Sequence, residues 1–344
     1  MRITVAAAGM LAVALVAGSA ACGGSGEPDT TAEPSVTAQS GPPETAAAAS
    51  PSPSPPPTGT ARMGRAPASP TPSKSSSAPP SRPTGKPGPD NTGVPAGTKL
   101  KVVTGDQTYS KSNQVLSGLD IRGYVRITGK NVTLRNSIVR GGAERCNASA
   151  VISVEGSARI EYTEIRPSNP SPCLDGVRGS NITMVAVDIH GVVDGVKAGD
   201  NVLIEHSYIH DLSWFASDPN QGGGSTHNDA VQSFGDRNIT LRHNTLLAGR
   251  DGNAAWQVTQ DDGGTATNLR VENNWLDGGG CTLNFAHKGG PTPMTGIHVV
   301  NNRFGRGSSH NCPILISTQT RLSTNSGNVW MDTGEPIPRP QQHD

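Results

Sequence analysis

The sequence predicts an all-β protein, a single-stranded right-handed parallel β-helix of about eight coils preceded by a disordered linker. Two observations carry this prediction. A short phrase recurs along the chain, and apolar and polar residues alternate within its copies. The clear copies are NVTLRNSIVRGG, NITMVAVDIHGV, NVLIEHSYIHDL and NITLRHNTLLAG, which begin at Asn131, Asn181, Asn201 and Asn238, and looser copies begin at Ala158, Asn268 and Gly296.

The spacing of the copies indicates a solenoid. Their starts lie between 20 residues apart (181 to 201) and 37 residues apart (201 to 238). Units of this length bury their apolar faces only against neighbouring units. In the copy at 201, Val202 and Ile204 share one parity and Leu203 has the other, and a period of two indicates strand rather than helix. Each unit is therefore expected to hold two or three short strands.

A column of small polar residues favours stacking of the units. The sixth residue after the start of a copy is Ser or Asn in the following cases: Ser137, Ser207, Asn244, Asn274 and Asn302. Such side chains can hydrogen-bond from coil to coil, as asparagine ladders do in stacked sheets. The copy at 181 interrupts the column with Val187. The alternative, that Asn and Ser only mark turns, stays open.

Residues 1–22 have the features of a signal peptide. Arg2 precedes an apolar run from 3 to 16, and small residues lead to Cys22. The run is too short for a transmembrane helix. Cys22 after small residues resembles a bacterial lipobox, in which the cysteine is lipidated. Ser19 stands where that motif usually has leucine, so a lipid anchor on the outer face of the membrane and ordinary secretion are both open.

Composition divides the rest of the chain. Residues 23–95 are dominated by Pro, Ser, Thr, Ala and Gly, and such a segment is expected to be a disordered linker. All twelve Phe, Trp and Tyr residues lie between Tyr109 and Trp330, so residues 96–335 are expected to form one β-helix domain and 336–344 a disordered tail. The 28 basic and 28 acidic residues balance, so no nucleic-acid partner is indicated. We expect a monomer that meets the membrane only through Cys22.

The other four cysteines are expected to form two disulfides. Cys146 and Cys173 each lie 15 residues after the start of a copy, at 131 and 158. Cys281 and Cys312 lie 13 and 16 residues after the starts at 268 and 296. Cysteines stacked on consecutive coils are close enough to bridge. The predicted pairs are Cys146–Cys173 and Cys281–Cys312, which suits an oxidising exterior.

Three related phrases on consecutive coils mark a candidate site. HNDAVQ at 227–232 matches DGVR at 175–178 and DGVK at 194–197. Aligned, they form a column of aspartates (Asp175, Asp194, Asp229) and a row of longer polar residues (Arg178, Lys197, Gln232), which Gln257 extends. By parity the row faces outward. A strip of Arg, Lys and Gln on one sheet face is suited to an acidic sugar polymer.

The aspartate column has two readings. Each aspartate can close the turn that enters its strand, through hydrogen bonds to its own backbone. Alternatively, Asp194 and Asp229 bind a calcium ion, or they act as the acid and base of glycoside cleavage.

The insertion at 211–228 is the longest interruption of the repeat. It carries Trp214, Phe215 and a glycine-rich hinge before His227. Long loops on a rigid scaffold usually hold function. We expect residues 211–226 to stay outside the stacked core and to form one wall of a groove, with Trp214 or Phe215 stacking on a sugar. His190 and His210 occupy equal positions in consecutive copies and are expected to stack.

The coil pattern and the HNDAVQ phrase resemble the pectate-lyase-like superfamily of right-handed parallel β-helix proteins, and more closely secreted bacterial β-helix proteins with an HxDxxQ-type phrase. That superfamily includes polysaccharide lyases, epimerases, glycoside hydrolases, esterases and non-catalytic adhesins, so the resemblance implies a fold more firmly than a function.

The leading hypothesis is an extracellular lyase or epimerase acting on a uronate-containing polymer. The expected catalytic residues are Arg178, Lys197, His227 and Asp229. Arg178 would neutralise the substrate carboxylate, and Lys197 or His227 would remove the proton beside it. The expected binding residues are Asp194, Trp214, Gln232 and Gln257. The alternatives are a hydrolase with an Asp194–Asp229 pair, a non-catalytic module that binds glycan or cell wall, and a structural spacer.

Overall fold

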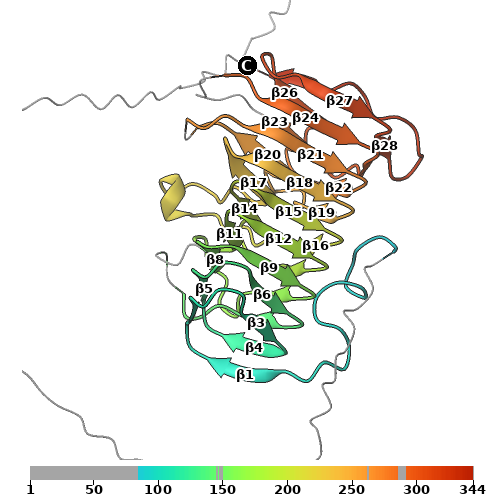
Figure 1. Ribbon diagram of the computed structural model, residues 1–344. Helices are drawn as coiled ribbons and strands as arrows, with labels where there is room; N and C mark the ends of the chain where they lie inside the picture. Colours follow the sequence, from blue (N-terminus) through green and yellow to red (C-terminus); the bar gives the residue numbers. More distant parts are fainter. Residues whose placement is uncertain (1–83, 145, 147–149, 262, 286–291, 344) are drawn as a thin grey trace, which may run out of the picture. The chain divides into compact units, whose positions relative to one another are not determined.

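The computed structural model describes residues 84–144, 146, 150–261, 263–285 and 292–343 (Figure 1). Within these ranges the chain forms β-strands, a single 3-10 turn at Pro219–Gln221 and no α-helix. The strands run in a repeating order through three sheets, which we call A, B and C, and the pairs between successive coils are parallel. The predicted all-β parallel β-helix is confirmed. The expected signal peptide, Cys22 and most of the linker lie outside the described residues.

Sheet A has ten strands. In order along the sheet they are β1 (Lys101–Thr104), β4 (Leu119–Arg122), β7 (Ile138–Val139), β10 (Glu164–Ile165), β13 (Asp188–Ile189), β16 (Tyr208–Ile209), β19 (Thr245–Leu247), β22 (Trp275–Asp277), β25 (Arg303–Phe304) and β28 (Val329–Trp330).

Sheet B has ten strands and carries the candidate site. They are β2 (Gln107–Tyr109), β5 (Val125–Ile127), β8 (Ala150–Val154), β11 (Asp175–Gly179), β14 (Val196–Ala198), β17 (Asp229–Phe234), β20 (Ala254–Thr259), β23 (Cys281–Phe285), β26 (Cys312–Ser317) and β29 (Gln341–His343).

Sheet C has nine strands. They are β3 (Val115–Ser117), β6 (Val132–Arg135), β9 (Ala158–Glu161), β12 (Ile182–Val185), β15 (Val202–Glu205), β18 (Arg237–Arg242), β21 (Thr267–Glu272), β24 (Thr295–Val300) and β27 (Leu322–Ser326).

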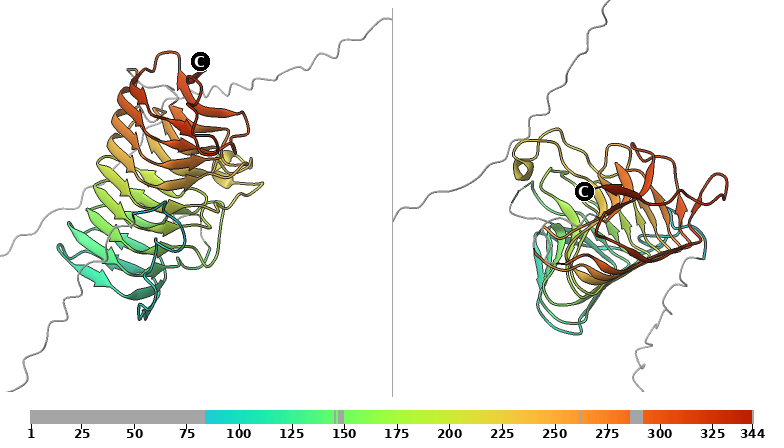
Figure 2. Two further views of the ribbon diagram at one scale, coloured as in Figure 1. Left: turned by 90° about the vertical axis from the view of Figure 1, so that its right-hand side faces the viewer. Right: turned by 90° about the horizontal axis from the view of Figure 1, so that it is seen from above.

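Ten coils stack in the described domain, where about eight were expected. Figure 2 shows the stack from two further sides. The additional coils at the start, between 101 and 127, lack the asparagine-led phrase, so the repeat alone does not reveal them. Inward-facing apolar residues from every coil form one continuous core. In sheet C, for example, Ile182, Val202 and Ile239 lie in register and are fully buried. Each such side chain contributes about 1.5–3 kcal/mol of burial.

The predicted polar ladder is present and continues to Asn328. The backbone N–H of Asn244 donates to Asn274 Oδ1 at 2.8 Å, and Asn274 and Asn302 repeat this bond to the next coil. Their side-chain amides also donate to backbone carbonyls, so each carboxamide is satisfied although it is buried. Val187 interrupts the column of polar side chains as expected, but its backbone N–H still donates to Ser207 Oγ on the next coil.

A second ladder explains why the copies begin with asparagine. Asn181, Asn201 and Asn238 have φ values of 58°, 61° and 60°, in the left-handed region that asparagine tolerates better than most residues. Asn201 Nδ2 donates to Asn181 Oδ1, and Asn238 Nδ2 donates to Asn201 Oδ1. The initial asparagine therefore makes the corner and ties it to the neighbouring coil.

The structured part of the chain begins earlier than the linker prediction. Pro87 and Gly93 lie within the expected linker, yet Thr245 Oγ1 donates to Pro87 O at 2.7 Å and Gly93 N donates to Ala186 O at 2.9 Å. The contacts are made largely by backbone atoms. Amino-acid composition indicates how much apolar surface a segment can bury, but it does not indicate whether its backbone will hydrogen-bond to other coils.

The expected disordered tail after 335 contains a strand for the same reason. β29 adds to the edge of sheet B, where Leu315 pairs with Gln341 and Ile316 with Gln342. A polar segment can pair in this way because an exposed sheet edge offers unpaired backbone groups. No described segment is a helix long and apolar enough to cross a membrane.

Both predicted disulfides are present. Cys146 bonds to Cys173 with a Cα–Cα distance of 5.0 Å, and Cys281 bonds to Cys312 with a Cα–Cα distance of 4.6 Å. The second pair lies directly opposite across β23 and β26. Each bridge therefore links neighbouring coils, as the equal offsets predicted.

Candidate functional site

The outward face of sheet B carries one continuous row of polar side chains. Arg178 pairs with Lys197, Lys197 with Gln232, Gln232 with Gln257, and Gln257 with Asn284. The residues before them in each strand point inward and are buried (Val177, Val196, Val231, Trp256 and Leu283). The row predicted from the repeat is thus confirmed, and we call it the polar row. Asn284 was not predicted as a member of the row. The signal was available, because Asn284 lies between Leu283 and Phe285 and therefore has the outward parity of the row.

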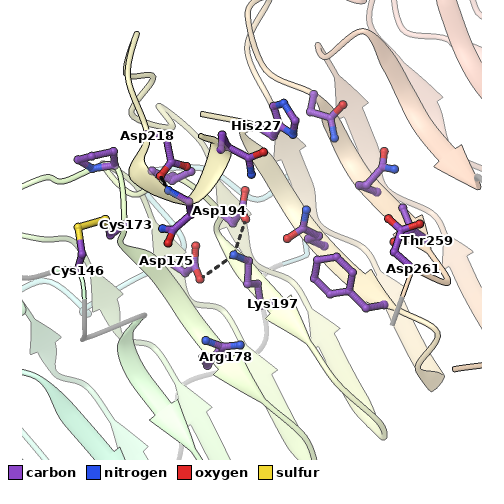
Figure 3. A pocket seen from close by; sticks show the side chains of 18 of the residues that line it. Cys146, Cys173, Asp175, Arg178, Asp194, Lys197, Asp218, His227, Thr259 and Asp261 are labelled. Carbon is purple, nitrogen blue, oxygen red and sulfur yellow. Dashed lines mark hydrogen bonds and ion pairs between the residues drawn. A yellow bond between two sulfur atoms is a disulfide. The ribbon is translucent and has the colours of Figure 1, made fainter. Parts of the chain in front are cut away.

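The polar row lines an open cavity of about 570 Å³, which we call the groove (Figure 3). Every member of the row contributes to its lining, as does His227. The insertion supplies a wall through Asp218, Asn220 and Gln221. The 3-10 turn and Gly222, whose φ of 62° is left-handed, reverse the chain there. The structure therefore brings together Arg178, Lys197, His227, Gln232, Gln257 and Asp194.

Lys197 lies between two buried carboxyl groups. Its Nζ is 3.2 Å from Asp175 Oδ2 and 3.3 Å from Asp194 Oδ2 (Figure 3). The Lys197 side chain is 29% exposed, whereas those of Asp175 and Asp194 are only 5% and 3% exposed. The ammonium group therefore covers both carboxyl groups on the side of the groove.

This arrangement shifts the pKa values of all three groups. Burial and the charge of Asp194 raise the pKa of Asp175 to about 7, although Lys197 acts in the opposite direction. Burial raises the pKa of Asp194 as well. For Lys197, burial alone would lower the pKa, but the two carboxylates outweigh it and raise the pKa. Lys197 therefore keeps its proton, and its expected role as a base does not fit this environment.

Asp229, expected to be catalytic, lies beneath the groove rather than in its lining. It is fully buried, and Gln232 Nε2 donates to its Oδ2 at 3.1 Å. Asn253 Nδ2 donates to Oδ1, also at 3.1 Å. Burial raises the pKa of Asp229 well above its usual range. In this arrangement its carboxyl oxygens accept from Gln232 and Asn253.

The aspartate column agrees only in part with the turn-closing reading. The register of Val177, Val196 and Val231 places Asp175, Asp194 and Asp229 on successive coils. Asp194 Oδ1 accepts the backbone N–H of Asp229 at 2.8 Å, so this bond joins two coils and does not close the turn of Asp194 itself. Asp175 and Asp194 nevertheless also line the groove, so they can take part in its chemistry.

The expected calcium site does not fit this donor set. Calcium takes six to eight oxygen ligands. Here the oxygens of Asp194 face Lys197 and a backbone N–H, and those of Asp229 face two side-chain amides. Among the described residues no cluster of three or more His, Cys, Asp or Glu is arranged to hold a metal. We therefore assign no step to calcium.

Trp214 lies outside the groove. Its side chain is 51% exposed and borders a separate hollow of about 610 Å³, with Arg250 and His310. Ser213 N is still bonded to Val192 O, so Trp214 emerges at the base of the insertion before the chain reaches the groove. Phe215 does not line the groove either. The expected stacking of either aromatic ring on a sugar in this groove is not supported by their positions.

The histidine pair also lies elsewhere. His190 and His210 stack as predicted, with ring centroids 5.1 Å apart. They directly follow β13 and β16 of sheet A. His210 Nε2 is 2.9 Å from Asp188 Oδ1. Burial would lower the pKa of His210, but bonds to Asp188 and Asp211 outweigh it and raise the pKa. The pair does not line the groove.

Comparison with known proteins assigns no family. No protein-family model matches the chain, and no curated protein matches it. Among solved structures, the chain has a remote similarity to the crystal structure of the Dettilon tailspike protein, with 12% sequence identity and a TM-score of 0.19. The match covers 70% of this chain and 61% of the tailspike chain. A similarity at this level carries no argument about function.

Proposed function

We propose that this protein binds a uronate-containing polysaccharide in the groove on sheet B and acts on it as a lyase or epimerase. The observation that carries the proposal is that an exposed guanidinium (Arg178), a held ammonium (Lys197) and an exposed imidazole (His227) line one open groove. These three groups match the requirements for removing a proton beside a carboxylate.

The roles follow from the environment of each group. Arg178 lies one strand, about 4.8 Å, from Lys197 and is free to pair with a substrate carboxylate. His227 accepts the proton at ring carbon five. In a lyase, the released electron pair forms the double bond to carbon four, the bond from carbon four to the glycosidic oxygen breaks, and Lys197 protonates that oxygen. In an epimerase, a proton instead returns to carbon five from the opposite face.

Glycoside hydrolysis is a second candidate, favoured by a different observation. Asp175, with a pKa of about 7, and Asp194 both line the groove and contact the same ammonium group. A protonated carboxyl group beside a second carboxyl group is the pairing that glycosidases use. In this case Asp175 would protonate the leaving oxygen, and Asp194, rather than the fully buried Asp229, would be the second carboxyl group of the pair.

The location of the protein follows from the same proposal. A polymer-degrading groove and two disulfides suit a protein outside the cell. Residues 1–22 would direct export, and Cys22 would carry the lipid anchor. Labelling cells with a radioactive fatty acid and comparing the native chain with C22A tests the anchor, because the variant should carry no label and should be released into the medium.

The function is tested by incubating the full secreted chain with a panel of uronate polymers and neutral polymers. Three signals are followed: ultraviolet absorbance of unsaturated products, exchange of the carbon-five proton in deuterated water, and new reducing ends. His227→Ala and Arg178→Gln should each lose activity by at least a hundredfold. His298→Ala is the matched control, because His298 lies on sheet C, outside the groove.

The outcomes separate the candidates. Absorbance or proton exchange that depends on His227 supports the lyase or epimerase. Reducing ends without either signal, abolished by Asp175→Asn, identify a hydrolase. Binding without any reaction identifies a non-catalytic glycan-binding module. If no glycan binds or reacts, the proposed function is wrong.

A further inference from the structure

One end of the groove holds polar atoms that are buried and have no partner. They are Gln257 Oε1, Thr259 Oγ1 and Asn284 Oδ1, and none of them has a hydrogen-bond partner among the described residues. The three residues line the groove on β20 and β23. Gln257 is two strands from Lys197 along the polar row, roughly 10 Å away.

A few buried polar atoms outside the groove, such as Asn136 Oδ1, also lack a hydrogen-bond partner among the described residues. A buried polar group without a hydrogen bond is costly, and native proteins satisfy most of them. In the ladder of Asn244, Asn274 and Asn302, every carboxamide has partners on neighbouring coils. The fold can therefore satisfy buried amides, and the groove is one of the places where it does not. The residues that carry these buried atoms all line the groove.

The hydrogen-bonding capacity of these atoms indicates which kind of ligand would bind to them. Two amide oxygens accept hydrogen bonds, and the hydroxyl of Thr259 can accept or donate. The lining cations, Arg178 and Lys197, are on β11 and β14, at the other end of the polar row. Asp261, at the end near Thr259, would repel a carboxylate. Half-buried Phe234 pairs with Thr259 and offers an apolar ring surface.

We propose that the groove is chemically polarised and takes a mixed polymer. Its cationic end, Arg178 and Lys197, binds an acidic sugar unit, and its neutral end, Phe234, Gln257, Thr259 and Asn284, binds a neutral sugar through hydroxyl donors. The preferred substrate is then a polysaccharide in which uronate and neutral units are neighbours, rather than a pure polyuronate. This inference rests on the proposed function for the acidic unit, whereas the neutral end rests on the unpaired atoms.

The test uses shape-conserving variants of the full chain. Thr259→Val and Gln257→Met remove the unpaired atoms with little change of volume. Ser153→Ala is the control, because Ser153 pairs with Arg178 on the same sheet face and does not line the groove. Calorimetric titrations use three oligosaccharides of equal length: pure uronate, pure neutral sugar, and alternating uronate and neutral sugar.

The expected result has two parts. The alternating oligosaccharide should bind at least tenfold tighter than the pure uronate. Thr259→Val and Gln257→Met should each weaken its binding about three- to tenfold, without changing the binding of pure uronate. Both variants should also raise the Tm of the unliganded protein, because an apolar group replaces an unpaired polar one. Ser153→Ala should change neither binding nor Tm.

Several results would overturn the proposal. Equal binding of the pure and alternating oligosaccharides would show that the neutral end selects nothing. A lower Tm with unchanged binding would assign Gln257 and Thr259 to the fold. In both cases uronate would still bind through Arg178, so the proposed function would survive. Conversely, the protein could bind the neutral oligosaccharide but neither of the others, with binding weakened by Thr259→Val. That result would support the neutral end and contradict the proposed function.

Discussion

At the scale of single residues, the chemistry of the groove is set by one cation between two acids. Lys197 is held 3.2 Å from Asp175 and 3.3 Å from Asp194, and the three groups alter one another's protonation. The exposed pair Arg126–Glu155 contains the same kinds of charge at 2.6 Å, but both side chains are more than half exposed. Burial, rather than distance, therefore distinguishes the groove from ordinary surface ion pairs.

Removing the ammonium group should destabilise the fold. Lys197→Met leaves two buried carboxyl groups without a counter-charge, so we expect a loss on the order of 3 kcal/mol in the free energy of unfolding at neutral pH. Arg126→Met should leave the urea midpoint nearly unchanged, because both partners are exposed. Urea unfolding of the two variants measures the contrast. Equal effects would mean that Asp175 and Asp194 are solvated in solution.

The raised pKa of Asp175 gives stability a definite pH dependence. Between its usual value of 3.8 and about 7, the folded state keeps a proton that the unfolded state has released. The contribution of Asp175 to the free energy of unfolding is therefore full below 3.8 and is lost as the pH rises towards 7. Asp175→Asn removes this dependence, so the variant should gain stability relative to the native protein across that window. Urea unfolding at several pH values measures it, and a constant difference would contradict the raised pKa.

At the scale of elements, the insertion divides into an anchored base and a wall. Leu212 packs against the core, and Asn228 Nδ2 donates to Val193 O and Ser213 O, so the base contributes to the stack, contrary to expectation. Asp218, Asn220 and Gln221 form the wall of the groove, and Trp214 faces a different hollow. The two parts should therefore be separable by mutation.

Replacing residues 214–224 by a short Gly-Ser turn should leave the Tm within a few degrees, because the exposed part of a loop adds little to global stability. Glycan binding in the groove should be lost, since the wall and the position of His227 depend on the insertion. Trp214→Ala in the intact chain is the control and should bind normally. A collapse of the Tm would place the exposed part of the insertion in the core, and binding that survives would place the glycan elsewhere.

The buried asparagine ladder is the element that holds the coil corners together. Asn274 accepts from the N–H of Asn244 and donates to Leu241 O and Asn302 Oδ1. Asn274→Ala leaves several buried groups unpaired and should cost about 3 kcal/mol. Asn268→Gly, in the exposed ladder, keeps the left-handed corner and should cost much less. Chemical denaturation distinguishes them, and similar losses would mean that water replaces the buried bonds.

At the scale of the whole molecule, each coil of the β-helix contacts its neighbours along three sheets, so stability accumulates coil by coil. The two disulfides fasten this stack at separate places, between β23 and β26 and between Cys146 and Cys173. They close loops with sequence separations of 27 and 31 residues.

Reduction should lower the stability of the stack without preventing its formation. Loops of these lengths predict a loss of about 3–4 kcal/mol for each bridge. The Tm should fall on adding a reductant, and alkylation of the native protein should label none of Cys146, Cys173, Cys281 and Cys312 beforehand. The far-ultraviolet circular dichroism of the reduced protein should remain that of β-structure. A free thiol at any of these four cysteines in the native protein would contradict the pairing.

The sequence alone determined the stacked coils, the disulfide pairs and the polar row, because these follow from local periodicity. Parity places Arg178, Lys197 and Gln232 outward, and equal offsets along the repeat place them side by side. Only the tertiary structure decided what surrounds them. The burial that surrounds Lys197, the lack of partners for the oxygens of Gln257 and Asn284, and the separate hollow of Trp214 all depend on how the coils and the insertion pack together. The polar segments at 84–95 and 336–343 were misjudged for the same physical reason, since their order comes from bonds to other coils rather than from their own composition.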